Sequence, residues 1–93
     1  MVKRYKPKFK NETSFGGTKH TIFLSRIRLG KRPANKKYNE SSVTYHKNQI
    51  KHRKRIKLPV VEKLKSGYRI VDGWHRLKAM KALRIRKSRV EVV

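Results

Sequence analysis

Cysteine and acidic residues are what this sequence of 93 residues most lacks. Without cysteine, the chain has no disulfide, no thiol catalysis and no cysteine-based zinc site. Its five carboxylates are never closer than ten residues apart, and they are Glu12, Glu40, Glu62, Asp72 and Glu91. Nucleases hold their metal ions with clustered carboxylates, so this spacing argues against a metal centre. We therefore expect no metal, no cofactor, no catalytic residue and no enzymatic activity.

Long apolar runs are absent as well. No stretch approaches the roughly 18 to 20 residues of a membrane-spanning helix, and the first ten residues contain no apolar segment of a secretory signal. The same segment is rich in lysine rather than in arginine and serine, and Pro7 disfavours the amphipathic helix of a mitochondrial presequence. We expect a cytoplasmic protein without a membrane partner, although a mitochondrial location stays open.

The histidines are few and widely spaced. They stand at positions 20, 46, 52 and 75, and no two have the spacing of a helical metal-binding pair. For His46 we favour a packing or capping role, and for His75 contact with a phosphate or with the start of its own helix. Asp72 is expected to cap that helix rather than to act as a base, and Trp74 is expected to belong to the core.

Positive charge is what the sequence has in excess. Its 28 Lys and Arg residues against five Asp and Glu give a formal net charge of +23. A compact chain with this charge repels itself unless a polyanion or counterions neutralise it. The basic residues form clusters in four predicted elements, at 3–10, 31–37, 51–57 and 84–89. From these clusters we predict the following RNA-binding residues: Lys3, Arg4, Lys6, Lys8, Lys10, Lys31, Arg32, Lys36, Lys37, Lys51, Arg53, Lys54, Arg55, Arg84, Arg86 and Lys87.

The spread of the charge favours RNA over DNA. Sequence-specific DNA-binding proteins usually concentrate charge on one face and present a recognition helix, and we find no helix-turn-helix pattern. Charge in several separate elements suits burial within folded RNA, where phosphates approach from many directions. We therefore predict an RNA-binding structural component of a ribonucleoprotein, favouring a ribosomal protein that contacts rRNA and neighbouring proteins. A chromosome-associated DNA-binding protein is an alternative.

Two parts of the chain differ in pattern. Residues 1–19 predict an extended basic arm, because a basic segment is followed by a polar, glycine-rich stretch without helical or strand periodicity. In the arm Tyr5 and Phe9 alternate with lysine and arginine, which suits stacking on bases while the charges meet phosphates. A solvated tail is an equal alternative. We expect the arm to be ordered mainly by its partner.

Residues 20–93 predict an α+β domain with a small mixed sheet and two helices. The expected elements, in chain order, are a strand at 21–29, a loop at 30–40, a helix at 42–54, a hairpin of strands at 58–61 and 68–71, a helix at 74–83 and a strand at 88–93. The apolar residues that should form one core are Leu58, Val60, Ile70, Leu77, Met80, Leu83, Val90 and Val92.

One motif stands at the start of the second helix. It follows a predicted strand with a glycine turn and then the start of a helix, and its sequence is Asp72-Gly73-Trp74-His75-Arg76-Leu77-Lys78-Ala79. The free N–H groups at such a junction suit a phosphate. It resembles the phosphate box of ParB/sulfiredoxin-like domains, which reads roughly Asp-Gly-x-His-Arg-x-x-Ala. Leu58-Pro59-Val60-Val61 looks like the Pro-Pro-Ile-x-Val strand of that family, and the segment at 89–93 looks like its closing strand.

The resemblance implies that Gly73, His75 and Arg76 bind phosphate and that Ala79 packs closely against the domain. It also implies an alternative function, that of a phage- or plasmid-type ParB-like nucleotide-binding protein or nuclease. Sulfiredoxins, however, carry their catalytic cysteine immediately before His-Arg, where this sequence has Trp74. Partition proteins of the family add a second nucleotide motif and a helix-turn-helix. Neither motif is found by residue 93, so we expect a ParB-like domain without catalysis.

Overall fold

The computed structural model describes residues 5–30 and 40–93. Six of the predicted RNA-binding residues, together with most of the predicted loop, lie outside these ranges; the six are Lys3, Arg4, Lys31, Arg32, Lys36 and Lys37. The described elements are β1 (Lys8–Phe9), β2 (Thr18–Phe23), a short 3₁₀ turn (Leu24–Arg26), β3 (Ile27–Arg28), α1 (Glu40–Lys51), β4 (Arg55–Ile56), β5 (Val60–Lys63), β6 (Tyr68–Asp72), α2 (Trp74–Ala82) and β7 (Lys87–Val92).

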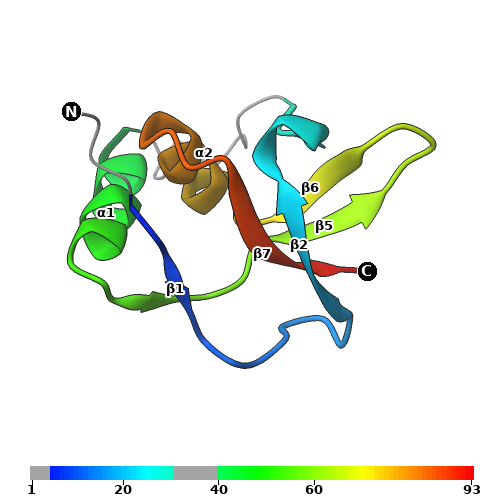
Figure 1. Ribbon diagram of the computed structural model, residues 1–93, viewed down its shortest axis with the longest axis horizontal. Helices are drawn as coiled ribbons and strands as arrows, with labels where there is room; N and C mark the ends of the chain where they lie inside the picture. The colour runs from blue at the N-terminus through cyan, green and yellow to red at the C-terminus, as the bar shows by residue number, and fades with distance from the viewer. Residues whose placement is uncertain (1–4, 31–39) are drawn as a thin grey trace.

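A five-stranded mixed sheet forms the centre of the fold, in the order β2-β7-β5-β6-β3. β5 and β6 form the predicted antiparallel hairpin, while β5 runs parallel to β7 and β3 runs parallel to β6. The two helices pack against each other and lie to one side of the sheet (Figure 1). The structure therefore confirms the predicted α+β class with a small mixed sheet and two helices.

The core lies between the helices and the sheet. Leu77 and Met80 of α2, Ile50 of α1 and Val61 of β5 belong to one buried apolar cluster. Val60 is also fully buried but lies outside that cluster. A register shift of the β-bulge type between Val60 and Val61 interrupts the regular alternation of side chains here. The expectation of a single core is therefore wrong for Val60, and likewise for the buried Leu58.

The predicted strand at 21–29 is divided in the structure. Its first half pairs with β7 and its second half with β6, at opposite edges of the sheet, and the 3₁₀ turn joins them. The sheet must therefore curl strongly at this corner, because three residues connect its two edges. Leu24 and Ile27 are both buried at the turn, and this spacing of three explains why one straight strand would not bury both.

The N-terminal segment contacts the domain. β1 runs parallel to β4, with Lys8 opposite Arg55, and the Lys10 N–H donates a hydrogen bond to the Ile56 carbonyl at 2.9 Å. The side chain of Phe9 packs against the core cluster. The sequence predicts no strand before residue 20, and this is wrong, because a two-residue strand leaves no periodicity to read. The division of the chain into arm and domain at residue 19 stays a prediction.

Candidate nucleic-acid and phosphate sites

Three of the four basic clusters come together around β1. Pairing of β1 with β4 places the cluster at residues 6–10 beside the cluster at residues 51–57. On its other side, the segment at residues 5–9 shares a groove with residues 83–89. All the described members of the predicted RNA-binding set are exposed, and they are Lys6, Lys8, Lys10, Lys51, Arg53, Lys54, Arg55, Arg84, Arg86 and Lys87. We call this convergence of the three clusters the arm surface.

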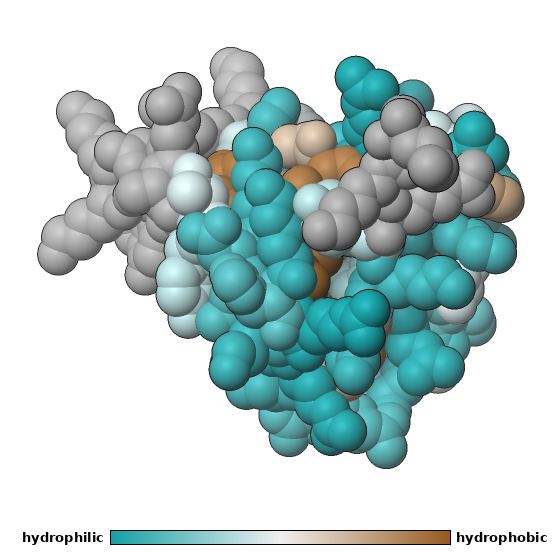
Figure 2. All heavy atoms as spheres, turned by 60° about the vertical axis from the view of Figure 1, so that its left-hand side comes forward, coloured by the Kyte–Doolittle hydropathy of each residue, from teal (hydrophilic) through white to brown (hydrophobic). Residues whose placement is uncertain are grey.

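The groove of the arm surface has a volume of about 1020 Å³. It is lined by Tyr5, Lys6, Pro7, Phe9, Thr21, Leu83, Arg84, Ile85, Arg86, Lys87, Ser88 and Arg89. The face of the molecule in Figure 2 is mostly hydrophilic, and hydrophobic residues show mainly in the hollow between the hydrophilic ones. A lining that combines aromatic rings with cations suits nucleic acid, whose bases are flat and whose phosphates are anionic.

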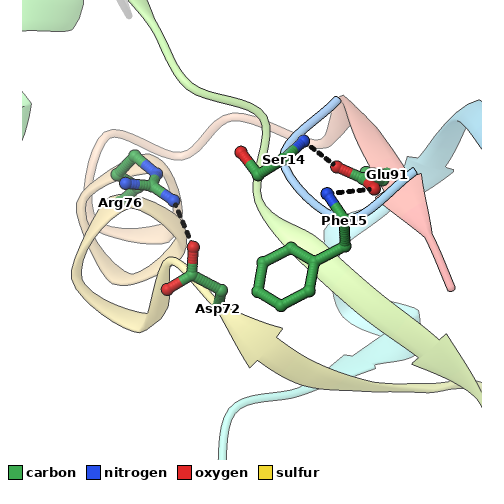
Figure 3. Close-up of polar contacts among 5 residues, drawn as sticks. All are labelled: Ser14, Phe15, Asp72, Arg76 and Glu91. Carbon is green, nitrogen blue, oxygen red and sulfur yellow. Dashed lines mark hydrogen bonds and ion pairs between the residues drawn. The ribbon is translucent and has the colours of Figure 1, made fainter. Parts of the chain in front are cut away.

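The predicted phosphate box lies at a second place, where β6 meets α2. Gly73 occupies the N-cap position with φ 94°, and the Leu77 N–H donates to its carbonyl at 2.9 Å. The amides of residues 74–76 therefore precede the hydrogen-bond ladder of the helix. Asp72 stands one residue before the N-cap and makes no capping hydrogen bond, so the predicted cap is wrong. Its carboxylate instead accepts a hydrogen bond from Arg76 at 3.4 Å (Figure 3).

Arg76 folds back over the glycine of the box. Its side chain is 14% exposed, and a Cβ atom added at Gly73 would lie 2.8 Å from a guanidinium nitrogen. The positive φ of 94° favours glycine at the position, whereas the flexible guanidinium could move away from a Cβ atom. The structure thus brings Gly73, His75 and Arg76 together at one junction. Phosphate binding by them stays a prediction.

His46 of α1 joins the box from the neighbouring helix. Three buried nitrogens around this junction lack a hydrogen-bond partner: His46 Nδ1, Trp74 Nε1 and Arg76 Nε. Burial lowers the pKa of His46 to about 4, and the charges of Arg76 and His75 add to the effect. His46 is therefore neutral at physiological pH. Because buried polar atoms are normally satisfied, the three nitrogens are candidate donors or acceptors for a polar or anionic ligand.

Glu91 is a site residue that the sequence does not reveal. Its side chain is fully buried, and its carboxylate accepts hydrogen bonds from the backbone N–H groups of Ser14 at 2.7 Å and Phe15 at 2.9 Å (Figure 3). The Gly17 N–H donates a third hydrogen bond to it at 2.7 Å. Burial acts to raise the pKa of Glu91, but the three donors outweigh it, so the pKa lies below its usual value. This carboxylate fastens residues 14–17 to β7.

The described parts of the chain also bear on metal binding and membrane insertion. Within residues 5–30 and 40–93, no group of three His, Asp or Glu side chains is close enough to hold a metal ion. None of the described helices has the length and apolar character needed to cross a bilayer. The expectations of no metal and no cofactor stay predictions.

Comparison with known proteins identifies the fold. No family model matches the sequence, and no curated protein matches it. Among solved structures, the fold is similar to the crystal structure of sulfiredoxin from Arabidopsis thaliana, with a TM-score of 0.66 and 19% sequence identity. The similarity covers 82% of this chain and 84% of the sulfiredoxin chain. It confirms the predicted ParB/sulfiredoxin-like fold, and at this level of identity it concerns the fold alone.

Proposed function

We propose that the protein binds nucleic acid, RNA in preference to DNA, as a non-catalytic component of a ribonucleoprotein such as the ribosome. The observation that carries the proposal is the arm surface, where three clusters that are distant in sequence form one exposed cationic region. Five carboxylates cannot neutralise 28 basic side chains, so the balance must come from a partner or from counterions.

Several features favour RNA as that partner. Besides the arm surface, exposed cations stand at the other end of the sheet, on β3, on β6 and in the turn between β5 and β6; examples are Arg28, Lys65 and Arg69. Phosphates of a folded RNA can reach a protein from more than one side, whereas a straight DNA duplex meets mainly one face. The neighbouring partners would then be rRNA and the proteins that surround it.

Binding of short oligonucleotides tests this proposal. We expect single-stranded RNA to bind more tightly than DNA of the same sequence, as measured by fluorescence anisotropy. The logarithm of affinity should fall with the logarithm of salt concentration at a slope of about −0.7Z to −0.9Z, with Z on the order of 6 to 10 phosphate contacts. In native lysate the protein should sediment with particles and leave them after ribonuclease treatment. Tighter binding to DNA would favour the chromosome-associated alternative, and a flat salt response would contradict the proposal.

A second candidate function, nucleotide binding at the box, is favoured by the three unpartnered nitrogens around Arg76. Titration with ATP or CTP, followed through the NMR signals of Arg76 Nε–H and Trp74 Nε1–H, tests it. We expect no hydrolysis of nucleotide or nucleic acid in the presence of divalent metals, because the carboxylates are scattered. Turnover that is lost in Arg76→Ala but retained in Arg69→Ala would instead establish the ParB-like enzyme alternative.

A further inference from the structure

We propose that the groove of the arm surface binds single-stranded nucleic acid, with bases against its aromatic rings and phosphates against its cationic rim. The inference rests on the proposed function and deepens it, because it assigns the site and the strandedness of the ligand. The groove lies between residues 5–9 and residues 83–89 and has a volume of about 1020 Å³. It is separate from the box, whose residues do not belong to its described lining.

The apolar part of the groove is held in place by the core. Tyr5, Phe9, Leu83 and Ile85 line the groove and also pack against the buried cluster. The two aromatic rings are therefore fixed before a ligand arrives, which reduces the entropy lost on binding. Lys51 places its Nζ over the Tyr5 ring, 6.0 Å from the ring centre, so a cation lies against one face of this aromatic ring. Proteins that bind single strands combine these two features.

The rim of the groove is positive throughout. Five basic residues line it, namely Lys6, Arg84, Arg86, Lys87 and Arg89, and all are exposed. Among the described residues that line the groove, none is an aspartate or a glutamate. This charge selects an anionic occupant and disfavours a second copy of the chain, which carries the same net charge of +23.

Arg84 on this rim has a strained backbone. Its φ is 60°, in the left-handed region that glycine adopts readily and that a residue with a Cβ atom avoids. The position follows α2 directly, where glycine is the common residue. Strained residues of this kind cluster at functional sites. The backbone at this position favours glycine, so a role of the charge in binding would explain why the residue is an arginine.

The shape of the groove favours a single strand over a duplex. Its volume is at the upper end of the roughly 300–1,000 Å³ of small-molecule sites, which suits a short segment rather than one small anion. Bases in a duplex are stacked and paired, so their faces cannot reach Tyr5 or Phe9. Unstacked bases of a single strand can lie against such rings.

Anisotropy with two labelled RNA probes tests the inference, a short oligouridine and a hairpin duplex of equal charge. Phe9→Leu keeps an apolar side chain on the core but removes the aromatic face. It should weaken oligouridine binding about fivefold or more and leave duplex binding nearly unchanged. Arg86→Gln should weaken oligouridine binding more than Lys65→Gln, which removes the same charge from the turn between β5 and β6. Thermal unfolding of each variant checks that it is folded, and ultraviolet cross-linking of oligouridine to the wild type should label Tyr5 or Phe9.

The outcomes separate this inference from the proposed function. If RNA binds but cross-links map elsewhere, and Phe9→Leu and Arg86→Gln behave like the wild type, the groove is not the site while the proposed function stands. If neither probe binds the wild type, both proposals fail. If polyglutamate of equal charge displaces oligouridine as effectively as unlabelled oligouridine does, the groove recognises charge alone and base stacking is contradicted.

Discussion

Glu91 is a charged side chain at a buried position, and its three backbone donors explain why it is tolerated there. Replacing Glu91 with Gln introduces an NH₂ group that faces N–H donors and removes the charge that they stabilise. We expect Glu91→Gln to lower the free energy of unfolding at neutral pH by about 2 to 4 kcal/mol. Denaturant unfolding measures this. Glu62→Gln, at a partly exposed position paired with Arg69, is the control and should change stability by less than about 0.5 kcal/mol.

The difference in stability between the wild type and Glu91→Gln should depend on pH with a definite sign. Because the pKa of Glu91 is lowered in the folded state, its ionised form stabilises the fold above the unfolded pKa. That stabilisation is lost as the pH falls through the folded pKa. The difference between wild type and Glu91→Gln should therefore be largest near neutral pH and shrink in acid. A difference that grows in acid would contradict the assignment.

His46 provides a second residue-level prediction. Its pKa is lowered from 6.5 to about 4. Between these two pH values, His46 is therefore protonated in the unfolded chain but neutral in the folded chain. The contribution of His46 to stability is complete above pH 6.5 and declines as the pH falls toward 4. Histidine NMR titration should place His46 near 4. Arg76→Gln should raise that pKa without restoring it fully, because burial remains, whereas Arg69→Gln should leave it unchanged.

At the scale of elements, the sequence predicts what periodicity and turn chemistry encode. The hairpin, α2 and the final strand are confirmed at nearly their expected bounds, and so is the fold that the box implied. Short or irregular pieces escape such prediction. β1 has two residues, and the turn that divides the predicted strand at 21–29 depends on which strands pair with its two halves. Likewise, no local sequence pattern indicates that His46 lies near the box or that Glu91 contacts residues 14–17.

The structure changes the role expected for the N-terminal segment. From sequence we expect an arm ordered mainly by its partner, so deleting residues 2–15 should barely affect unfolding of the free protein. The contacts lead to a different expectation, because this deletion removes β1, the packing of Phe9 and two donors to Glu91. Unfolding should become easier by about 3 kcal/mol or more. Deleting only residues 2–4 removes Lys3 and Arg4 and should weaken RNA binding.

Both helices end in the same way. Arg53 after α1 has φ 56° and Arg84 after α2 has φ 60°. In each case the arginine N–H and the next N–H donate to carbonyls of the last helical turn, at distances from 2.9 to 3.1 Å, which is the Schellman pattern normally completed by glycine. Arginine fits the charge at a helix C-terminus but strains the backbone.

Paired substitutions separate strain from charge at these ends. Arg84→Gly and Arg84→Ala both remove the charge, but only glycine relieves the left-handed conformation. We expect Arg84→Gly to be more stable than Arg84→Ala by about 1 kcal/mol in thermal unfolding. Both should bind RNA more weakly than the wild type and by similar factors. Equal stability of the two variants would show that the backbone at this position is not strained.

At the scale of the whole molecule, the net charge and the size lead salt to affect the stability of the free protein and its affinity for RNA in opposite directions. The molecule measures 35 × 28 × 25 Å, and at about 0.01 M salt the Debye length of roughly 30 Å lets charges on opposite sides repel one another. Near 0.15 M it falls to about 8 Å, and only neighbours interact. Binding to RNA weakens over the same range, because counterions released into a more concentrated salt solution gain less entropy. Salt should therefore stabilise the free protein while it weakens the complex.

Thermal unfolding of the free protein across this range measures the first effect. We expect the unfolding temperature to rise steadily with sodium chloride, because screening reduces the self-repulsion of a net charge of +23. Sodium sulfate at matched ionic strength is the informative control, since a divalent anion that occupies the box would add stabilisation beyond screening. That additional increase should disappear in Arg76→Gln and persist in Arg69→Gln. An unfolding temperature that stays constant or falls with sodium chloride would mean that self-repulsion does not destabilise the folded chain, and it would remove the main reason to expect a polyanionic partner.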